Sequence, residues 1–285
     1  MKQNNLSNIH ETSFDKTDIN INDTANEYQL PNLGNSFNLE FNLEEIGEIT
    51  KFMKKSICKI DCKGLKGSGF LCKIKISNSK SINALITCNH VLNKNQIKEG
   101  DKINISFNNE KLKCIITINE STIVYTNEES DITIIEITGF GCKKYFLCLK
   151  IDLKYLKIDD NLVGVNPKDI YKDKEIVVFH YKGGEEVNYS IGKLNNIISE
   201  FFFHCCTTEG GSSGSPILML KNNKVIGIHL GGYEKKKEKE KSKIGTFIKK
   251  PIDDFIKKYK SDSRNNPLKN KKISNIEKVL TCKDK

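Results

Sequence analysis

The stretch Glu209-Gly210-Gly211-Ser212-Ser213-Gly214-Ser215-Pro216 places serines between glycines, directly before a run of apolar residues. Gly211 and Gly214 let the chain turn sharply and let a substrate carbonyl come close to the backbone. A serine hydroxyl becomes a strong nucleophile only when a base removes its proton. Ser213 is the candidate nucleophile, and the N–H groups of Gly211 and Ser213 are the candidate oxyanion hole. Taken alone, the motif also fits a Gly/Ser-rich hairpin turn without chemistry.

Two polar residues upstream complete a possible catalytic set. His90 follows the apolar run Ala84–Thr87, and Asp131 opens the apolar run Ile132–Ile137. A carboxylate at the start of a buried strand needs a partner. A hydrogen bond from one ring nitrogen of His90 to Asp131 would leave the other nitrogen facing Ser213. The three residues are therefore the predicted base, orienting carboxylate and nucleophile.

Alternatives remain open for each of these residues. A lone histidine is more often an ordinary hydrogen-bonded residue, and an aspartate before a strand is often a turn residue. Glu128 and Glu129 are nearby alternatives for the carboxylate. His180 and His204 lie inside predicted strands, where no catalytic role is expected for them.

Short β-branched runs separated by turn residues predict the fold. They form two series, one in each half of the chain. The predicted strands are Ser56–Cys62, Ser68–Ile76, Ala84–Thr87, Ile103–Phe107, Cys114–Ile118 and Ile132–Ile137, then Leu147–Ile151, Glu175–Tyr181, Val187–Ile198, Phe201–Thr207, Pro216–Leu220, Val225–His229 and Gly245–Lys249. We expect an all-β fold with two six-stranded antiparallel β-barrels and a C-terminal helix near Pro251–Tyr259.

Composition sets the expected domain boundaries. Residues 1–50 contain two lysines and nine acidic residues and predict a disordered acidic extension, although Leu43–Met53 fits one short helix. Residues 51–140 are the expected N-terminal β-barrel, joined near Gly139–Lys144 to a C-terminal barrel with its closing helix at 141–260. Residues 261–285 are the expected basic flexible tail, and the lysine-rich run Lys235–Lys243 is an expected exposed loop.

Charge and cysteine content bound the partners. The formal net charge is +10, so a basic tail that contacts nucleic acid or an anionic membrane is conceivable but is not favoured. The first residues show no apolar leader, and the sequence has no apolar run long enough to span a membrane. Together these two features predict an intracellular, cytoplasmic protein. The ten cysteines are then expected to be mostly free structural thiols. Cys58 and Cys62 have half of a zinc-site spacing but lack a second close pair, so no metal and no cofactor is expected.

Together these motifs resemble the trypsin-like serine peptidases of the chymotrypsin superfamily. The resemblance covers about residues 55–258. It rests on segments that occur in the family's order: Gly67–Leu71, Leu85–His90, Asp131–Ile135, Gly211–Pro216 and Val225–Gly232. Secreted digestive members have an aspartate before the nucleophile, where this chain has Ser212, and a cysteine after the histidine, where it has Val91. At these two positions the chain resembles glutamyl-endopeptidase-like and other members that need no N-terminal cleavage.

The resemblance also implies a substrate pocket. In members that prefer Glu or Gln, a threonine and a histidine occupy the places of Thr208 and His229. Both side chains donate hydrogen bonds that suit a side-chain carbonyl or carboxylate. The alternative for His229 is an inward strand residue bonded to a neighbour. The backbone of Leu230, Gly231 and Gly232 is expected to pair with an extended peptide.

The predicted function is a serine endopeptidase that acts on polypeptides, with a possible preference for Glu or Gln before the cleaved bond. A catalytically inactive barrel that binds peptides or a partner is the alternative. A nucleic-acid or membrane module that uses the basic tail is a third reading.

Overall fold

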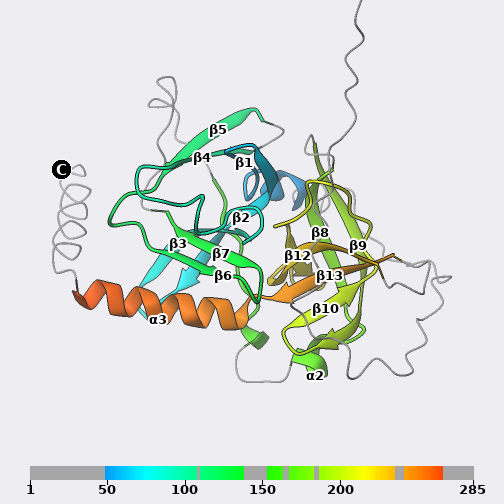
Figure 1. Cartoon of the computed structure of the whole chain (residues 1–285). Helices are drawn as coiled ribbons and strands as arrows, with labels where there is room; N and C mark the ends of the chain where they lie inside the picture. Colours follow the sequence, from blue (N-terminus) through cyan, green and yellow to red (C-terminus); the bar gives the residue numbers. More distant parts are fainter. Residues whose placement is uncertain are drawn as a thin grey trace, which may run out of the picture.

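The computed structural model describes residues 49–107, 110–137, 153–162, 167–182, 186–234 and 241–265. An antiparallel sheet and a closed antiparallel barrel, built from consecutive halves of the chain, lie side by side (Figure 1). The predicted joint Gly139–Lys144, the predicted strand Leu147–Ile151 and nearly all of the two predicted terminal extensions fall outside the described residues. Within those residues, no helix is both long and apolar enough to cross a membrane.

The first half of the chain forms one antiparallel sheet of seven strands in the order β5-β4-β1-β2-β3-β7-β6. Their bounds are β1 Ile57–Cys62, β2 Leu65–Lys75, β3 Ser81–Cys88, β4 Lys102–Phe107, β5 Leu112–Thr117, β6 Val124–Asn127 and β7 Ile132–Glu136. The strands β3 and β7 are almost wholly buried, because Ala84–Cys88 and Ile132–Ile135 are continuous apolar or small runs.

The second half forms a closed barrel of six strands in the order β10-β13-β12-β11-β8-β9. Their bounds are β8 Glu175–Lys182, β9 Glu186–Ile198, β10 Phe201–His204, β11 Pro216–Met219, β12 Val225–Glu234 and β13 Lys241–Phe247. The register of β12 on β13 shifts between His229 and Gly231, which leaves Leu230 in a bulge. Bulges beside a functional site redirect the neighbouring side chains.

The prediction of two six-stranded barrels is therefore right for the second half only. The first half has a seventh strand, β6, and the strand pairings described for its sheet do not close into a barrel. The sequence pattern missed β6 because its four residues are all half-buried and show no alternation. In the second half, the predicted strand Phe201–Thr207 ends early at His204, and residues 241–243 of the expected lysine-rich loop belong to β13.

Several contacts join the two halves. Residues 153–162 cross between them, where Leu156 N–H donates to Leu71 O at 2.9 Å and Asp159 N–H donates to Val225 O at 2.9 Å. The short helix η1 (Asp160–Leu162) ends this segment, and the helix α2 (Pro167–Tyr171) comes after it in the chain. The segment thus binds first the sheet and then the barrel, which fixes the two halves against each other.

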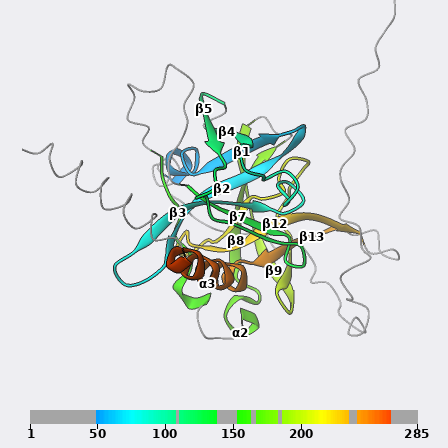
Figure 2. The same ribbon diagram turned by 60° about the vertical axis from the view of Figure 1, so that its left-hand side comes forward.

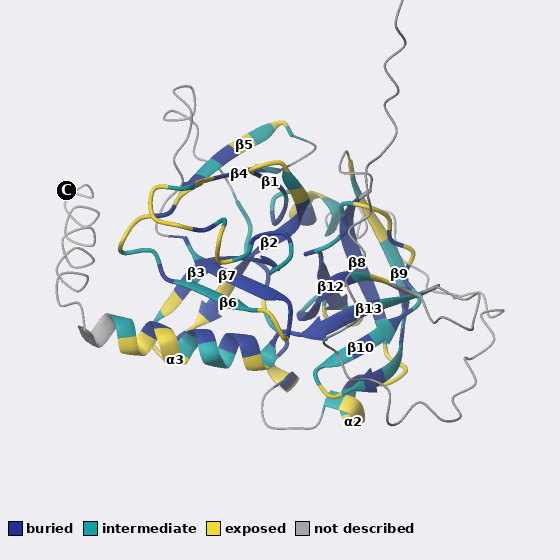
Figure 3. Cartoon of the chain, in the orientation of Figure 1, coloured by how far each residue is buried: buried dark blue, intermediate teal, exposed yellow. Residues whose placement is uncertain are grey.

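The C-terminal helix α3 (Lys249–Asn265) leaves the barrel and packs on the sheet, beneath β6 and β7 (Figures 1 and 2). Its buried residues Ile252, Phe255 and Tyr259 recur at helical spacing, and the opposite side of α3 is exposed (Figure 3). Lys258 Nζ donates to Val124 O at 2.6 Å. The helix is longer than the predicted Pro251–Tyr259 at both ends.

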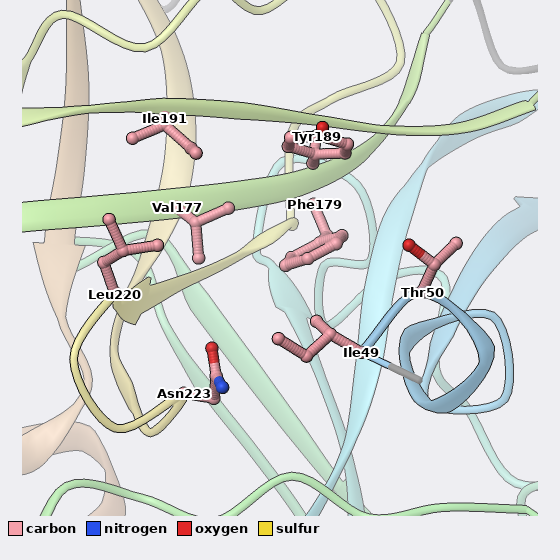
Figure 4. A pocket seen from close by; sticks show the side chains of 8 residues that line it. All are labelled: Ile49, Thr50, Val177, Phe179, Tyr189, Ile191, Leu220 and Asn223. Carbon is pink, nitrogen blue, oxygen red and sulfur yellow. The ribbon is translucent and has the colours of Figure 1, made fainter. Parts of the chain in front are cut away.

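An apolar pocket lies on the outer face of β8 and β9 (Figure 4). Val177, Phe179, Tyr189 and Ile191 form its wall, and Ile49 from the helical residues 49–53 faces them. None of the predicted site residues lines this pocket, so the candidate site must be built from the junction between the two halves.

Candidate active site

Asp131 and His90 form a tightly bonded pair where the neighbouring strands β3 and β7 end and begin. His90 comes two residues after β3 and Asp131 comes directly before β7, and these strands pair Cys88 with Ile132. The backbone N–H of His90 donates to Asp131 Oδ1 at 2.8 Å, and Nδ1 of the ring lies 2.6 Å from Oδ2. Asp131 adopts a left-handed backbone conformation, with φ of 49°. The carboxylate is buried while the ring remains partly open to solvent.

The loop that carries Ser213 is held by β2. Ser68 N–H donates to Ser213 O at 2.8 Å, and Ser68 Oγ donates to Gly211 O at 2.7 Å. The carbonyl of Ser68 accepts a hydrogen bond from Thr87 Oγ1 at 2.7 Å. Ser68 therefore connects the strand that leads to His90 with the loop that carries the candidate nucleophile.

Gly214 makes this close approach possible. Its φ is +91°, a conformation that disfavours any residue with a side chain. A Cβ at Gly214 would lie 1.9 Å from Ser68 O and 2.6 Å from Thr87 Oγ1. The residue after Ser213 thus packs directly against the strand that ends near His90.

One backbone carbonyl links the three segments. His229 O accepts a hydrogen bond from Gly214 N–H at 2.9 Å and from the Cys88 thiol at 3.3 Å. Burial raises the pKa of Cys88, which keeps the thiol protonated as a donor. The next carbonyl, that of Leu230, accepts the Ser213 hydroxyl at 2.9 Å. The fold therefore gathers the segments of His90, Asp131 and Ser213 at the junction of the sheet and the barrel.

The turn before Ser213 depends on a buried serine–histidine pair. Ser212 N–H donates to Glu209 O at 3.1 Å, and Gly211 has a φ of +86°. Ser212 Oγ accepts from Glu209 N–H at 3.3 Å and lies 2.8 Å from His180 Nδ1. Ser212 and His180 are both buried. Because a buried O–H needs an acceptor, we assign the Ser212 proton to the bond with His180 Nδ1.

His204 and His229 form a buried pair of imidazoles. Cys206 N–H donates to His204 Nδ1 at 3.3 Å, so the proton of that ring is on Nε2. His204 Nε2 lies 3.1 Å from His229 Nδ1 and donates to it, which leaves the proton of His229 on its own Nε2. Burial lowers the pKa of both rings, that of His204 to about 3. His229 is therefore a neutral ring with one N–H donor to offer.

The other predicted binding residues lie as follows. Thr208 is buried, and its hydroxyl has no hydrogen-bond partner within the described residues. Gly231 and Gly232 are the β12 residues that follow the bulge at Leu230. A Cβ at Gly231 would meet no atom within 4 Å. This side of β12 has room for an extended chain.

The cysteines of the described segments are free thiols, and Cys58 and Cys62 are both buried. Cys88, His90 and Asp131 have potential ligand atoms within 4.8 Å of one another. His90 and Asp131 are bonded to each other, and the Cys88 thiol donates to His229 O. These hydrogen bonds account for the closeness of the three side chains without a metal ion.

Sequence reasoning missed Ser68, His180 and His204. Ser68 stands between Gly67 and Gly69, a pattern that marks a close backbone approach. His180 and His204 are polar residues within apolar strands, and a buried imidazole in that setting requires a partner. The partner itself lies on another strand and has no local signal.

The comparisons with known proteins agree with this architecture. A family model described as a trypsin-like peptidase domain matches residues 67–228. No curated protein matches the sequence. The serine endoprotease from Yersinia pestis is similar in structure, with a TM-score of 0.50 and 10% identity over 74% of this chain and 66% of that chain. An inactive form of Rv3671c from M. tuberculosis H37Rv gives a TM-score of 0.46 and 14% identity, over 70% of this chain and 84% of that chain.

At 10% identity, the Yersinia pestis structure shows similarity of fold alone. The family model, however, spans more than half of the chain and contains the segments of His90, Asp131 and Ser213. The protein therefore belongs to the trypsin-like peptidase domain family.

Proposed function

We propose that the protein is a serine endopeptidase in which Ser213 is the nucleophile, His90 the general base and Asp131 the orienting carboxylate. The observation that carries the proposal is the double hydrogen bond from His90 to Asp131. It holds the ring proton on Nδ1, so that Nε2 is the ring nitrogen that would accept the proton of Ser213.

The reaction follows from this arrangement. The Ser213 hydroxyl turns from Leu230 O towards His90 and attacks the substrate carbonyl while its proton passes to Nε2. The backbone N–H groups of Gly211 and Ser213 stabilise the oxyanion of the tetrahedral intermediate. The C–N bond then breaks, His90 gives its proton to the leaving amine, and a water activated by His90 hydrolyses the acyl ester. No part of this sequence requires a cofactor.

Thr208 and His229 support a preference for Glu or Gln before the cleaved bond. The buried hydroxyl of Thr208 has no partner among the described residues, and His229 has one N–H to donate. A side-chain carbonyl or carboxylate that accepts from both would satisfy these groups. A pocket built for such an acceptor rejects apolar side chains, because they would leave both donors unpaired.

An extended substrate fits the open side of β12. The backbone of Leu230, Gly231 and Gly232 is proposed to pair with the residues before the cleaved bond as an added strand. The open space beside Gly231 supports this role.

A fluorophosphonate probe tests the proposal. We expect the wild-type protein to be labelled at Ser213, and Ser213→Ala to lose both labelling and peptide cleavage. Ser215→Ala is the matched control, since the buried Ser215 hydroxyl has no partner within the described residues. That control is expected to label like wild type. A folded wild type that neither labels nor cleaves, yet binds peptides, would instead indicate an inactive peptide-binding module.

A further inference from the structure

The proposed pocket contains neutral donors but also lies beside a positive charge that sequence reasoning did not consider. Lys243 in β13 pairs with His204 of β10 on one side and with Gly232 of β12 on the other. Residues paired directly across antiparallel strands point their side chains to the same face of the sheet. Because His204 is buried, Lys243 lies on the face that carries the imidazole pair.

The Lys243 ammonium reaches the strand proposed to bind substrate. A Cβ placed on Gly232 would lie 3.6 Å from Lys243 Nζ. No other heavy atom outside the neighbouring residues would lie within 4 Å of that Cβ. The charge also acts on the imidazoles: after burial, Lys243 is the next cause of the lowered pKa of His204, and it contributes to that of His229. Lys243 is half-buried, and no carboxylate of the described residues forms an ion pair with it. Its ammonium therefore lies beside Gly232, within the segment proposed to pair with substrate.

The imidazoles cannot provide this charge themselves. Neutral Thr208 and His229 donors accommodate a carboxamide as well as a carboxylate, so alone they would not favour Glu over Gln. A carboxylate that leaves water loses its hydration and needs a nearby positive charge. We propose that Lys243 is a specificity-determining residue that selects Glu over Gln at the position before the cleaved bond. This inference rests on the proposed peptidase function and on the pocket at Thr208 and His229.

Paired peptides test the inference. Two fluorogenic peptides that differ only by Glu or Gln before the cleaved bond are compared by kcat/KM. We expect wild type to favour Glu by up to about fivefold, the upper end of the range for one partly exposed charge pair. Lys243→Met should remove or reverse this preference, and Lys243→Arg should retain it. Lys221→Met, which removes an exposed lysine after β11 of the same barrel, is the control for net charge and should keep the wild-type ratio.

Two further readouts separate the possible failures. Fluorophosphonate labelling of Ser213 should be unchanged in Lys243→Met, because the charge acts on the substrate side chain and not on the nucleophile. If wild type labels and the Glu-to-Gln ratio is the same in wild type and Lys243→Met, the role of Lys243 is wrong and the peptidase function stands. If wild type does not label, the peptidase function fails instead. Binding of the same two peptides to Ser213→Ala needs no turnover, and equal affinity for both would overturn the role of Lys243 in either case.

Discussion

Asp131 accepts two hydrogen bonds from a single residue, His90, one from its backbone N–H at 2.8 Å and one from its ring Nδ1 at 2.6 Å. The two bonds occupy different carboxylate oxygens, so the ring can neither rotate nor change its tautomer without breaking one. This geometry follows from the pairing of β3 with β7, which brings Cys88 beside Ile132. The orientation of the His90 ring, the proposed base, is thus a property of the sheet.

Asp131→Asn tests the orientation of the base. The amide can accept at one atom only and would favour the wrong tautomer of His90, so we expect kcat to fall by about 10⁴-fold with the fold intact. Steady-state kinetics and thermal unfolding measure the two effects. A variant with near wild-type kcat would show that Asp131 does not orient the base.

The buried pair of Ser212 and His180 is predicted to hold the turn at residues 209–213, which contains the proposed oxyanion donors Gly211 and Ser213. Ser212→Ala and His180→Leu each remove the same bond, and we expect kcat to fall by about 10²-fold in each, as for a displacement of catalytic groups by about 1 Å. The kcat of the double variant should be about that of the less active single variant, because the two changes remove the same hydrogen bond. His180→Asn keeps an acceptor near Nδ1 and should recover most of kcat.

A matched control separates catalysis from stability for this pair. Thr246→Val removes a buried hydroxyl that donates to Glu200 O at 3.2 Å in the same barrel and, within the described residues, makes no bond to the turn. It should lower the free energy of unfolding by about 1 kcal/mol without lowering kcat. Equal losses of kcat in the control and in Ser212→Ala would contradict a specific role for the pair.

Gly214 is predicted to tolerate no side chain. In Gly214→Ala, the new Cβ would meet Ser68 O and Thr87 Oγ1. Gly64 is the matched control, because its φ of +86° is similar but a Cβ there meets nothing within 4 Å. Gly64→Ala should therefore cost about 1–2 kcal/mol from backbone strain alone, and Gly214→Ala clearly more. Denaturant unfolding measures both, and equal costs would show that the packing at Gly214 is not limiting.

Stability should fall on mild acidification because of His204 and His229. Burial lowers the pKa of both rings below the unfolded value of 6.5, that of His204 to about 3. Between these values the unfolded chain binds more protons than the folded protein. Their contribution is therefore fully present above pH 6.5 and is lost as the pH falls towards 3.

Urea unfolding at pH 7, 6 and 5 checks this dependence. His204→Gln should show a shallower decrease of the free energy of unfolding between about pH 6.5 and 5, because one of the two groups no longer titrates. An unchanged slope in His204→Gln would mean that this ring does not remain neutral in the folded protein.

The fold could be predicted where the pattern was strong. The runs Ala84–Thr87 and Ile132–Ile137 gave β3 and β7 to within a few residues, because buried strands are continuous apolar segments. The four residues of β6 show no alternation. The start of β13, which contains Lys243, is not predicted as a strand because it belongs to the lysine-rich run that is expected to form a loop. Lysines signal exposure in a sequence, yet a strand at the rim of a barrel can hold one beside a pocket.

The sequence by itself determined which segments contain the candidate catalytic groups, because a glycine-flanked serine, a histidine after an apolar strand and an aspartate before another are all local patterns. Tertiary structure alone decided the partners that hold these groups. Ser68 meets Gly211 across 143 positions, Ser212 meets His180 across 32, and His204 meets His229 across 25. A hydrogen bond depends on the distance between atoms in space, and strand order and register set that distance only when the chain has folded.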